Sequence, residues 1–277
     1  MPAPLLVLAA ASSVQFGAAI AATMFDDLGP AGTSVFRVGL AALILLAVWR
    51  PRVRGVPRGD LWIVFWLGLT LGLMNLVFYE ALDRIPIGVA VTIEFAGPLG
   101  VAVALSRRRL DIAWVVLALA GIVLLADPGG GSVDPLGLVF VLIAAALWAA
   151  YILLTARAGE RFTGGRGLAL AMIVAALVPL GPGIAEAGDQ LLSPGLVATG
   201  AAVALLSSVI PYSLEMEALR RMPRNVFGVL MSIEPAVAAL AGFLILGQAL
   251  GARELVAIGL VIVASIGATR SYPPIDG

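Results

Sequence analysis

The sequence predicts an all-α membrane protein with ten transmembrane helices, arranged as two inverted five-helix repeats with both termini in the cytoplasm. The first observation is composition. Hydrophobic residues make up 61% of the 277 residues and charged residues 12%, which excludes an ordinary soluble domain. The second observation is the recurrence of long apolar runs, and the third is the placement of arginine between them.

Each expected helix is an apolar run bounded by glycine, proline or arginine clusters, and about 20 apolar residues cross a bilayer core. The first run lacks the basic segment of a signal peptide and is followed at once by a second run, so we interpret it as a helix. The fifth and tenth runs are the shortest. In order, the helices are expected at Leu5–Met24, Ala31–Trp49, Leu61–Leu82, Ile87–Leu105, Ile112–Ala126, Pro135–Leu154, Gly167–Ala185, Leu196–Leu219, Asn225–Leu246 and Arg253–Ala268.

Arginine placement tests this helix count, because basic residues concentrate in cytoplasmic loops. All 17 basic residues are arginine. Fourteen of them lie in the segments that follow the second, fourth, sixth, eighth and tenth runs, whereas the other loops hold only Arg84 and Arg253. The remaining one, Arg37, lies inside the second run. One helix more or fewer would break this alternation.

A short internal repeat divides the chain into halves. At an offset of 137 residues, residues 80–82 match residues 217–219, and matching arginine and proline residues follow in both halves. We expect one five-helix repeat at residues 1–133, a second at 134–270 and a short tail at 271–277. Since each repeat has an odd number of helices, the second enters the membrane from the opposite side. Inverted repeats of this kind place a substrate site near the midplane and indicate a transporter.

Missing residue types exclude several kinds of chemistry. The chain has no cysteine, histidine or lysine, which removes thiol nucleophiles, histidine relays and Schiff-base lysines. We expect no metal site, no cofactor and no nucleic-acid partner, and the absence of a GxxxxGK[ST] motif argues against ATP as the energy source. An intramembrane enzyme is therefore disfavoured. A channel or a membrane scaffold remains the alternative to a transporter.

Charged side chains inside the apolar runs need a reason, because a charge near the bilayer centre costs several kcal/mol unless it is paired or faces water. Glu80 and Glu217 each precede an arginine by four residues and are interpreted as interfacial ion pairs. The candidates for substrate or proton binding are Glu234, Glu94, Arg37 and Glu215. Arg37 and Glu94 have similar depth, and both a structural pair and a substrate-binding pair are consistent with that.

Prolines mark the same helices. Pro98, Pro211 and Pro235 have no N–H to donate, so each frees a carbonyl and is expected to kink its helix beside one of these acids. Freed carbonyls in a membrane face protein or a wet cavity. Further polar side chains expected at such a cavity are Tyr212, Tyr79, Asn75, Gln15 and Ser232, although interhelical hydrogen bonds would explain them equally.

The segments at residues 93–99 (IEFAGPL), 211–219 (PYSLEMEAL) and 228–236 (GVLMSIEPA) resemble the threonine/homoserine exporter branch of the drug/metabolite transporter superfamily, with its two EamA-type repeats. Arg37 resembles the arginine common in the second helix of such repeats. The resemblance implies a cavity lined by helices 1–4 and 6–9, with helices 5 and 10 outside. It also implies export of small amino acids from a bacterial cytoplasm through the inner membrane, in exchange for protons. Membrane lipid would be the other partner. Export of drugs, aromatic amino acids or other metabolites is the alternative within this fold.

Overall fold

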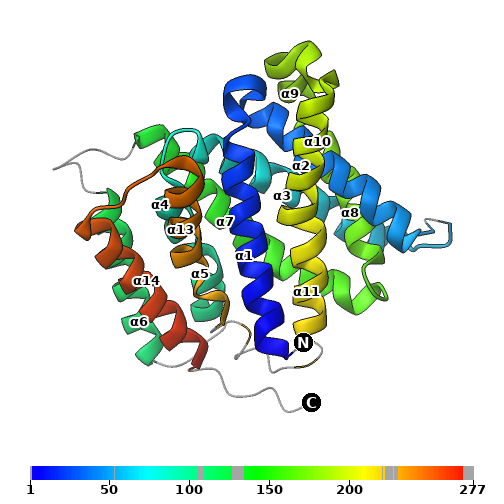
Figure 1. Ribbon diagram of the computed structural model, residues 1–277. Helices are drawn as coiled ribbons and strands as arrows, with labels where there is room; N and C mark the ends of the chain where they lie inside the picture. The colour runs from blue at the N-terminus through cyan, green and yellow to red at the C-terminus, as the bar shows by residue number, and fades with distance from the viewer. Residues whose placement is uncertain are drawn as a thin grey trace.

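The computed structural model describes residues 2–52, 54–104, 109–126, 134–219, 221, 227 and 230–270. In this part of the chain all regular elements are helices (Figure 1). They are α1 (Ala3–Ala22), α2 (Phe25–Trp49), α3 (Arg58–Leu82), α4 (Ile87–Glu94), α5 (Ala96–Ala104), α6 (Arg109–Ala126), α7 (Pro135–Arg161), α8 (Arg166–Leu177), α9 (Leu180–Ala187), the 3-10 helix η1 (Gly188–Leu192), α10 (Pro194–Ala204), the π-helix η2 (Leu205–Val209), α11 (Ile210–Leu219), α13 (Glu234–Leu246) and α14 (Ala252–Arg270).

Several of these helices are long and apolar enough to cross a membrane. Five meet both criteria, namely α1, α2, α3, α7 and the stretch Pro194–Glu215, and a sixth span is formed if α8 and the segment Leu180–Leu192, bent by 47°, are one crossing. Shorter apolar helices lie at Ile87–Val101, Ile112–Leu124 and Glu234–Leu246. The expectation of an all-helical, multi-pass membrane protein is therefore confirmed at this level.

The helix bounds differ from the expected ones in informative places. α1 ends at Ala22, and α2 begins at Phe25 and passes through a break at Gly29, where φ is +67°. α7 continues to Arg161, beyond the expected Leu154, because its polar end remains a good helix former. The expected repeat boundary at residue 133, the start of the ninth helix at Asn225 and the tail at 271–277 lie outside the described residues.

Three helix irregularities lie next to the expected kink prolines. α4 and α5 are separated at Phe95, three residues before Pro98. The π-helix η2 ends two residues before Pro211, and α13 begins at Glu234, directly before Pro235. Since proline cannot donate the backbone hydrogen bond of a regular turn, the helix is weakest at these points. The broken ends place carboxylate-bearing residues at helix termini inside the bundle.

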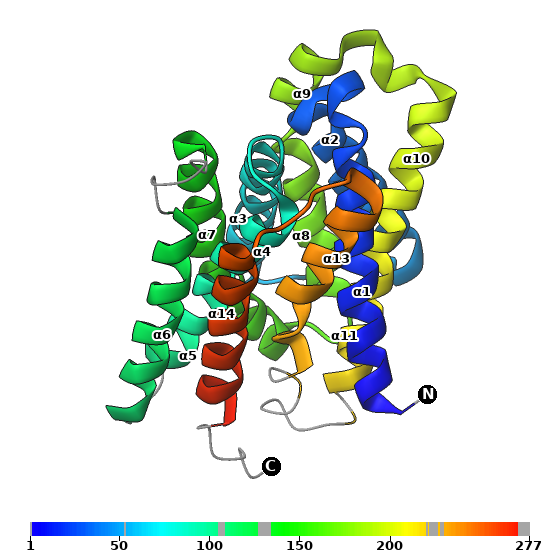
Figure 2. The same ribbon diagram turned by 60° about the vertical axis from the view of Figure 1, so that its left-hand side comes forward.

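The helices from the two halves of the sequence are interleaved. α3 packs against α7 and α8, α4 against α13, and α1 against α11 and α13. α6 and α14 pack against each other at one side of the bundle in both views (Figure 2). The backbone N–H of Ile87 at the start of α4 donates to Oε1 of Gln248, 3.0 Å away, in the connection between α13 and α14. The interior between the helices is therefore built by both halves together.

Candidate functional site

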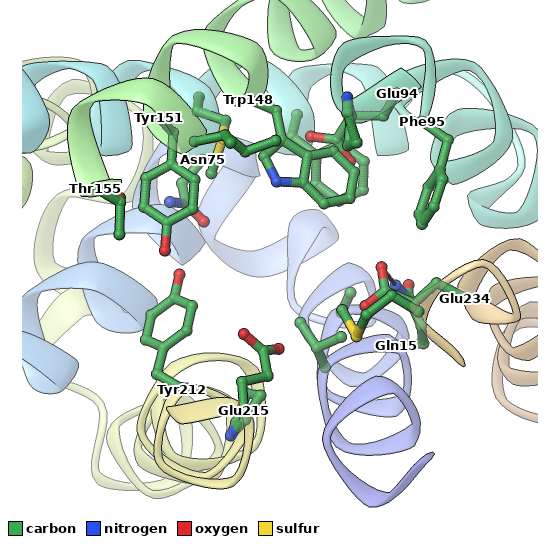
Figure 3. Close-up of a pocket in the computed structure, with 18 of the residues that line it drawn as sticks. Gln15, Asn75, Glu94, Phe95, Trp148, Tyr151, Thr155, Tyr212, Glu215 and Glu234 are labelled. Carbon is green, nitrogen blue, oxygen red and sulfur yellow. Dashed lines mark hydrogen bonds between the residues drawn. The ribbon is translucent and has the colours of Figure 1, made fainter. Parts of the chain in front are cut away.

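A cavity of about 490 Å³ is lined by residues from both halves of the sequence. Its size is within the roughly 300–1,000 Å³ typical of small-molecule sites. The polar side chains that line it come from eight helices (Figure 3). They are Gln15, Arg37, Asn75, Glu94, Tyr151, Thr155, Tyr212, Glu215, Glu234 and Ser265, with Trp148 adding an indole. Three carboxylates and one guanidinium therefore share one largely apolar chamber.

The carboxylates reach the cavity from three helices. Glu94 is the last residue of α4, Glu215 lies on α11 and Glu234 is the first residue of α13. Glu234 is 3% exposed and accepts a hydrogen bond from Nε2 of Gln15 on α1, at 3.4 Å. Within the described ranges, Glu94 and Glu215 have neither a hydrogen-bond nor a salt-bridge partner, and both line the cavity. Their oxygens remain available to a ligand.

Arg37 is buried in α2 and is held by a backbone carbonyl. Its Nη2 donates to the Ser207 oxygen in η2 at 3.3 Å, and its Cζ lies 5.1 Å from the centroid of the Tyr79 ring. No described carboxylate lies within salt-bridge distance of Arg37, so the direct Arg37–Glu94 ion pair that equal depth suggested is not formed. Depth along two helices fixes the height of two residues, not the direction in which their side chains point.

The π-helix explains why Ser207 offers its carbonyl. In η2 the N–H of Ile210 bonds to the Leu205 oxygen, one residue further back than in an α-helix. Pro211 has no N–H for the next carbonyl. The two freed oxygens have side-chain donors instead, since Oγ of Ser13 donates to the Leu206 oxygen at 2.7 Å and Arg37 donates to Ser207. This irregular turn is therefore tied to α1 and α2.

Hydroxyl and amide groups add hydrogen-bonding capacity to the chamber. Figure 3 shows the hydroxyls of Tyr151 and Tyr212 directed toward one another, with Thr155 beside Tyr151. Nδ2 of Asn75 donates to the Leu71 oxygen at 2.8 Å, which leaves its amide oxygen as an acceptor. Neutral donors and acceptors therefore lie near the charged ones.

Three residues expected at the site do not line the cavity. Tyr79 is fully buried, with its ring centroid 5.5 Å from that of Phe25. Ser232 shares a 2.7 Å hydrogen bond with Ser265, which is the residue that faces the cavity. Pro235 follows Glu234 but is not among the lining residues. Ser265 also corrects the expectation that the tenth helix stands apart, because it brings α14 into the lining.

The resemblance places the sixth helix, α7, at the cavity, but sequence reasoning did not identify the α7 residues that line it. Trp148, Tyr151 and Thr155 all line the cavity, and Trp148 packs edge-to-face on Phe95 with ring centroids 5.2 Å apart. Their spacing of three and four residues is one face of a helix. That spacing was the available signal, although in so apolar a run it would equally fit a packed helix face.

Outside the cavity, the two expected ion pairs with i, i+4 spacing are present. Nη1 of Arg84 lies 2.9 Å from Oε2 of Glu80. Arg221 and Glu217 form the matching pair one helical turn apart. In the described ranges, no group of three or more acidic, histidine or cysteine side chains could hold a metal ion.

Comparison with known proteins relates the whole chain to transporters. The model of the EamA-like transporter family matches residues 135–270. The threonine/homoserine exporter RhtA of Escherichia coli (strain K12) is 42% identical over 267 residues, which cover 95% of this chain and 90% of that protein. The RhtA of Salmonella typhimurium is also 42% identical, over 96% of this chain and 90% of that protein.

More distant matches agree with this relationship. The uncharacterized inner membrane transporter YedA of Escherichia coli (strain K12) is 25% identical over 92% of this chain and 85% of its own length. A solved chain, titled only as the crystal structure of a protein, has the same fold with a TM-score of 0.66 and 18% identity, over 97% of this chain and 96% of that chain. This chain therefore belongs to the EamA-like transporter family, as a multi-pass inner-membrane transporter and not an enzyme.

Proposed function

We propose that this protein is a secondary active exporter of small neutral amino acids, such as threonine and homoserine, and that it exchanges them for protons by alternating access. The observation that carries the proposal is the cavity in which Glu94, Glu215 and Glu234 meet Arg37. A zwitterion needs one anionic and one cationic partner, and this chamber has both. The two relatives named as threonine/homoserine exporters support the choice of substrate.

The proposed topology has ten crossings in two inverted five-helix repeats, with both termini in the cytoplasm. In its support, every expected apolar run contains helix within the described residues. The start of α1 and the end of α14 lie at the same end of the bundle (Figure 1), as an even number of crossings requires. The arginine alternation favours the cytoplasm for that end. Cysteine labelling from either side of the membrane would test the orientation, since the chain has no cysteine of its own.

For substrate binding, we assign Arg37 to the α-carboxylate. A guanidinium has five N–H donors, and a carboxylate can occupy two of them side by side. Arg37 uses Nη2 for Ser207, whereas its buried Nε has no hydrogen-bond partner among the described residues. The substrate's ammonium group would then bind a glutamate, with Glu234 first and Glu94 second. The Asn75 oxygen and the tyrosine hydroxyls are suited to a side-chain hydroxyl.

Proton exchange follows if one glutamate binds either the substrate ammonium or a proton, but not both. An ionised carboxylate in this apolar chamber is costly without a cationic partner. After the substrate has left on the outer side, the protein would therefore return to its inward-open state with a proton on this glutamate in place of the substrate ammonium. We assign this role to Glu234, because it lies on α13, which packs on α1 and α4.

The test is efflux of labelled L-threonine and L-homoserine from proteoliposomes, with and without a proton gradient. Wild type should show saturable, gradient-dependent efflux, and Glu234→Gln should lose it while the protein remains folded. The matched control is Glu217→Gln, which alters a glutamate paired with an arginine at a helix end. Full gradient-driven efflux in Glu234→Gln would contradict the coupling role, and no efflux of either amino acid by folded wild type would contradict the substrate assignment.

A second candidate substrate class has one observation in its favour. Trp148, Phe95, Tyr151 and Tyr212 give the cavity an aromatic lining, which suits aromatic amino acids or apolar drugs. Competition of labelled threonine efflux by a panel of aromatic amino acids and cationic dyes separates the two. Stronger competition by the panel than by homoserine would favour this second class.

A further inference from the structure

A second cavity, of about 510 Å³, lies where α2 ends, α3 begins, α7 ends and α8 begins. Four of its lining residues are arginines, Arg50, Arg52, Arg161 and Arg166, and one is an acid, Asp60. We call it the arginine pocket. It is separate from the central cavity, with which it shares no lining residue.

The arginine pocket has an excess of positive charge. Four guanidiniums face one carboxylate, which leaves three charges uncompensated. Nε of Arg161 lies 4.0 Å from Oδ1 of Asp60, and Nε of Arg50 donates to the Ala47 oxygen at 3.3 Å. Arg52 and Arg166 have no ion-pair partner within the described residues. Like charges gathered around a hollow repel one another, so an anion in the hollow would be stabilised.

Backbone dipoles add to this charge. α3 begins at Arg58 and α8 at Arg166. Their N-cap residues, Pro57 and Gly165, have no side chain that could accept a hydrogen bond from the first backbone N–H groups of the helix. Pro57 and Asp60 line the pocket at the first turn of α3, and Arg166 lines it at the first turn of α8. The N-terminal end of a helix attracts anions, and phosphate in particular. The start of α8, which has no acidic residue in its first turn, therefore reinforces the guanidiniums, whereas Asp60 already occupies the first turn of α3.

The aromatic residues around the arginine pocket indicate its depth in the membrane. Trp49 lines it and packs on the α7–α8 connection, where a Cβ on Gly165 would lie 2.5 Å from the indole nitrogen. An exposed aromatic cluster begins on α3 two residues beyond Asp60 and consists of Trp62, Phe65 and Trp66. Tryptophan is enriched at the level of lipid headgroups. The pocket therefore opens at the depth at which headgroup phosphates lie.

We propose that the arginine pocket binds the phosphate of an anionic phospholipid headgroup. Guanidiniums suit phosphate because they donate in pairs to its oxygens. A headgroup is favoured over a free phosphate ion because the positive hollow lies beside an exposed aromatic cluster at interfacial depth. The proposal concerns lipid binding alone and does not depend on the transported substrate.

The test is native mass spectrometry of the purified full chain with added phosphatidylglycerol or phosphatidylcholine. Wild type should retain phosphatidylglycerol preferentially. The variant Arg52→Gln/Arg166→Gln should bind it about 30-fold more weakly, since each arginine near a headgroup contributes about fivefold and the two contributions multiply. The matched control is Arg54→Gln/Arg157→Gln, which removes the same charge from the α2–α3 connection and from the last turns of α7 without touching the pocket lining. Phosphatidylglycerol binding by this control should weaken by no more than about threefold, as expected for a screened charge outside the site.

Two results would overturn the proposal. Equal loss of phosphatidylglycerol binding in both double variants would show that the attraction comes from diffuse positive charge. Displacement of phosphatidylglycerol by millimolar inorganic phosphate would show that the pocket binds a free anion. Should the double variant not fold, the single variant Arg52→Gln is expected to weaken binding about fivefold, and unchanged binding in a folded Arg52→Gln would count against the pocket. Arg52 is exposed, so its change leaves the packed helices intact.

Discussion

A close contact between α3 and α8 gives a prediction whose size can be worked out from the structure. Gly68 and Gly72 of α3 lie one turn apart and face Ala171 and Ala175 of α8, which are also one turn apart. A methyl group at Gly72 would lie 2.7 Å from the Ala175 oxygen and 2.6 Å from Cγ2 of Val178. Small residues at such spacing allow membrane helices to approach closely.

The substitution Gly72→Ala therefore forces α3 and α8 apart. Ordinary contact begins at 3.4 Å, so the Ala175 carbonyl must withdraw by about 0.7 Å. Because a backbone atom cannot rotate aside, the whole contact must move, and overpacking of this kind costs about 1–3 kcal/mol. The general gain from replacing a helical glycine, about 0.5–1 kcal/mol, opposes part of this. We expect a net loss of about 1–2 kcal/mol in the free energy of unfolding.

The matched control is Gly39→Ala on α2, where no atom lies within 4 Å of the added methyl group. It should be unchanged or more stable. The measurement is reversible unfolding in mixed micelles, titrated with sodium dodecyl sulfate. Adding Val178→Ala to Gly72→Ala removes the Cγ2 contact, leaves the Cβ contact at 2.7 Å, and should restore part of the lost stability. Equal stability of Gly72→Ala and Gly39→Ala would refute the reasoning.

Three further predictions concern other contacts. Glu186→Ala should cost about 1 kcal/mol in the same unfolding assay, because Oε2 of Glu186 accepts the Ala31 N–H at 2.9 Å beside the break in α2, whereas Glu186→Gln, which keeps an acceptor, should cost less. Pro211→Ala restores an N–H that can compete for the oxygens freed in η2, so we expect slower threonine efflux from a protein of equal or higher stability; unchanged efflux would speak against a role for this turn. Glu80→Gln should change stability by less than about 1 kcal/mol, as for other interfacial pairs, and a complete loss of efflux would show that Glu80 does more than pair.

The sequence was sufficient for features that depend on composition and local spacing. The i, i+4 spacing of Glu80 and Arg84 predicts a pair that the structure contains. Glu94, Glu215 and Glu234 are conspicuous because a charged side chain in an apolar run is costly unless it is paired or faces water. All three line the central cavity. The family resemblance is confirmed by the relatives.

Features that depend on helix rotation were not predictable. The Tyr151 and Thr155 hydroxyls lie four residues apart, a spacing that fits a packed helix face as well as a face that lines the cavity. Depth suggested Glu94 as the partner of Arg37, but the hydrogen bond goes to a carbonyl freed in η2. Pro211 indicates a freed carbonyl, yet a simple kink and a π-turn fit the same proline. Which of them forms depends on packing against α1, where Ser13 supplies the second donor.

The π-helix η2 also determines which side chains of α11 face the cavity. Each residue of an α-helix advances the rotation by about 100°. The wide turn at Leu205–Val209 therefore sets the angle at which Tyr212 and Glu215 emerge. Deleting one residue within it, with every residue of α11 left unchanged, would rotate both side chains by about a quarter turn, away from the chamber. In this part of the chain, the number of residues governs which side chains line the cavity as strongly as their identity does.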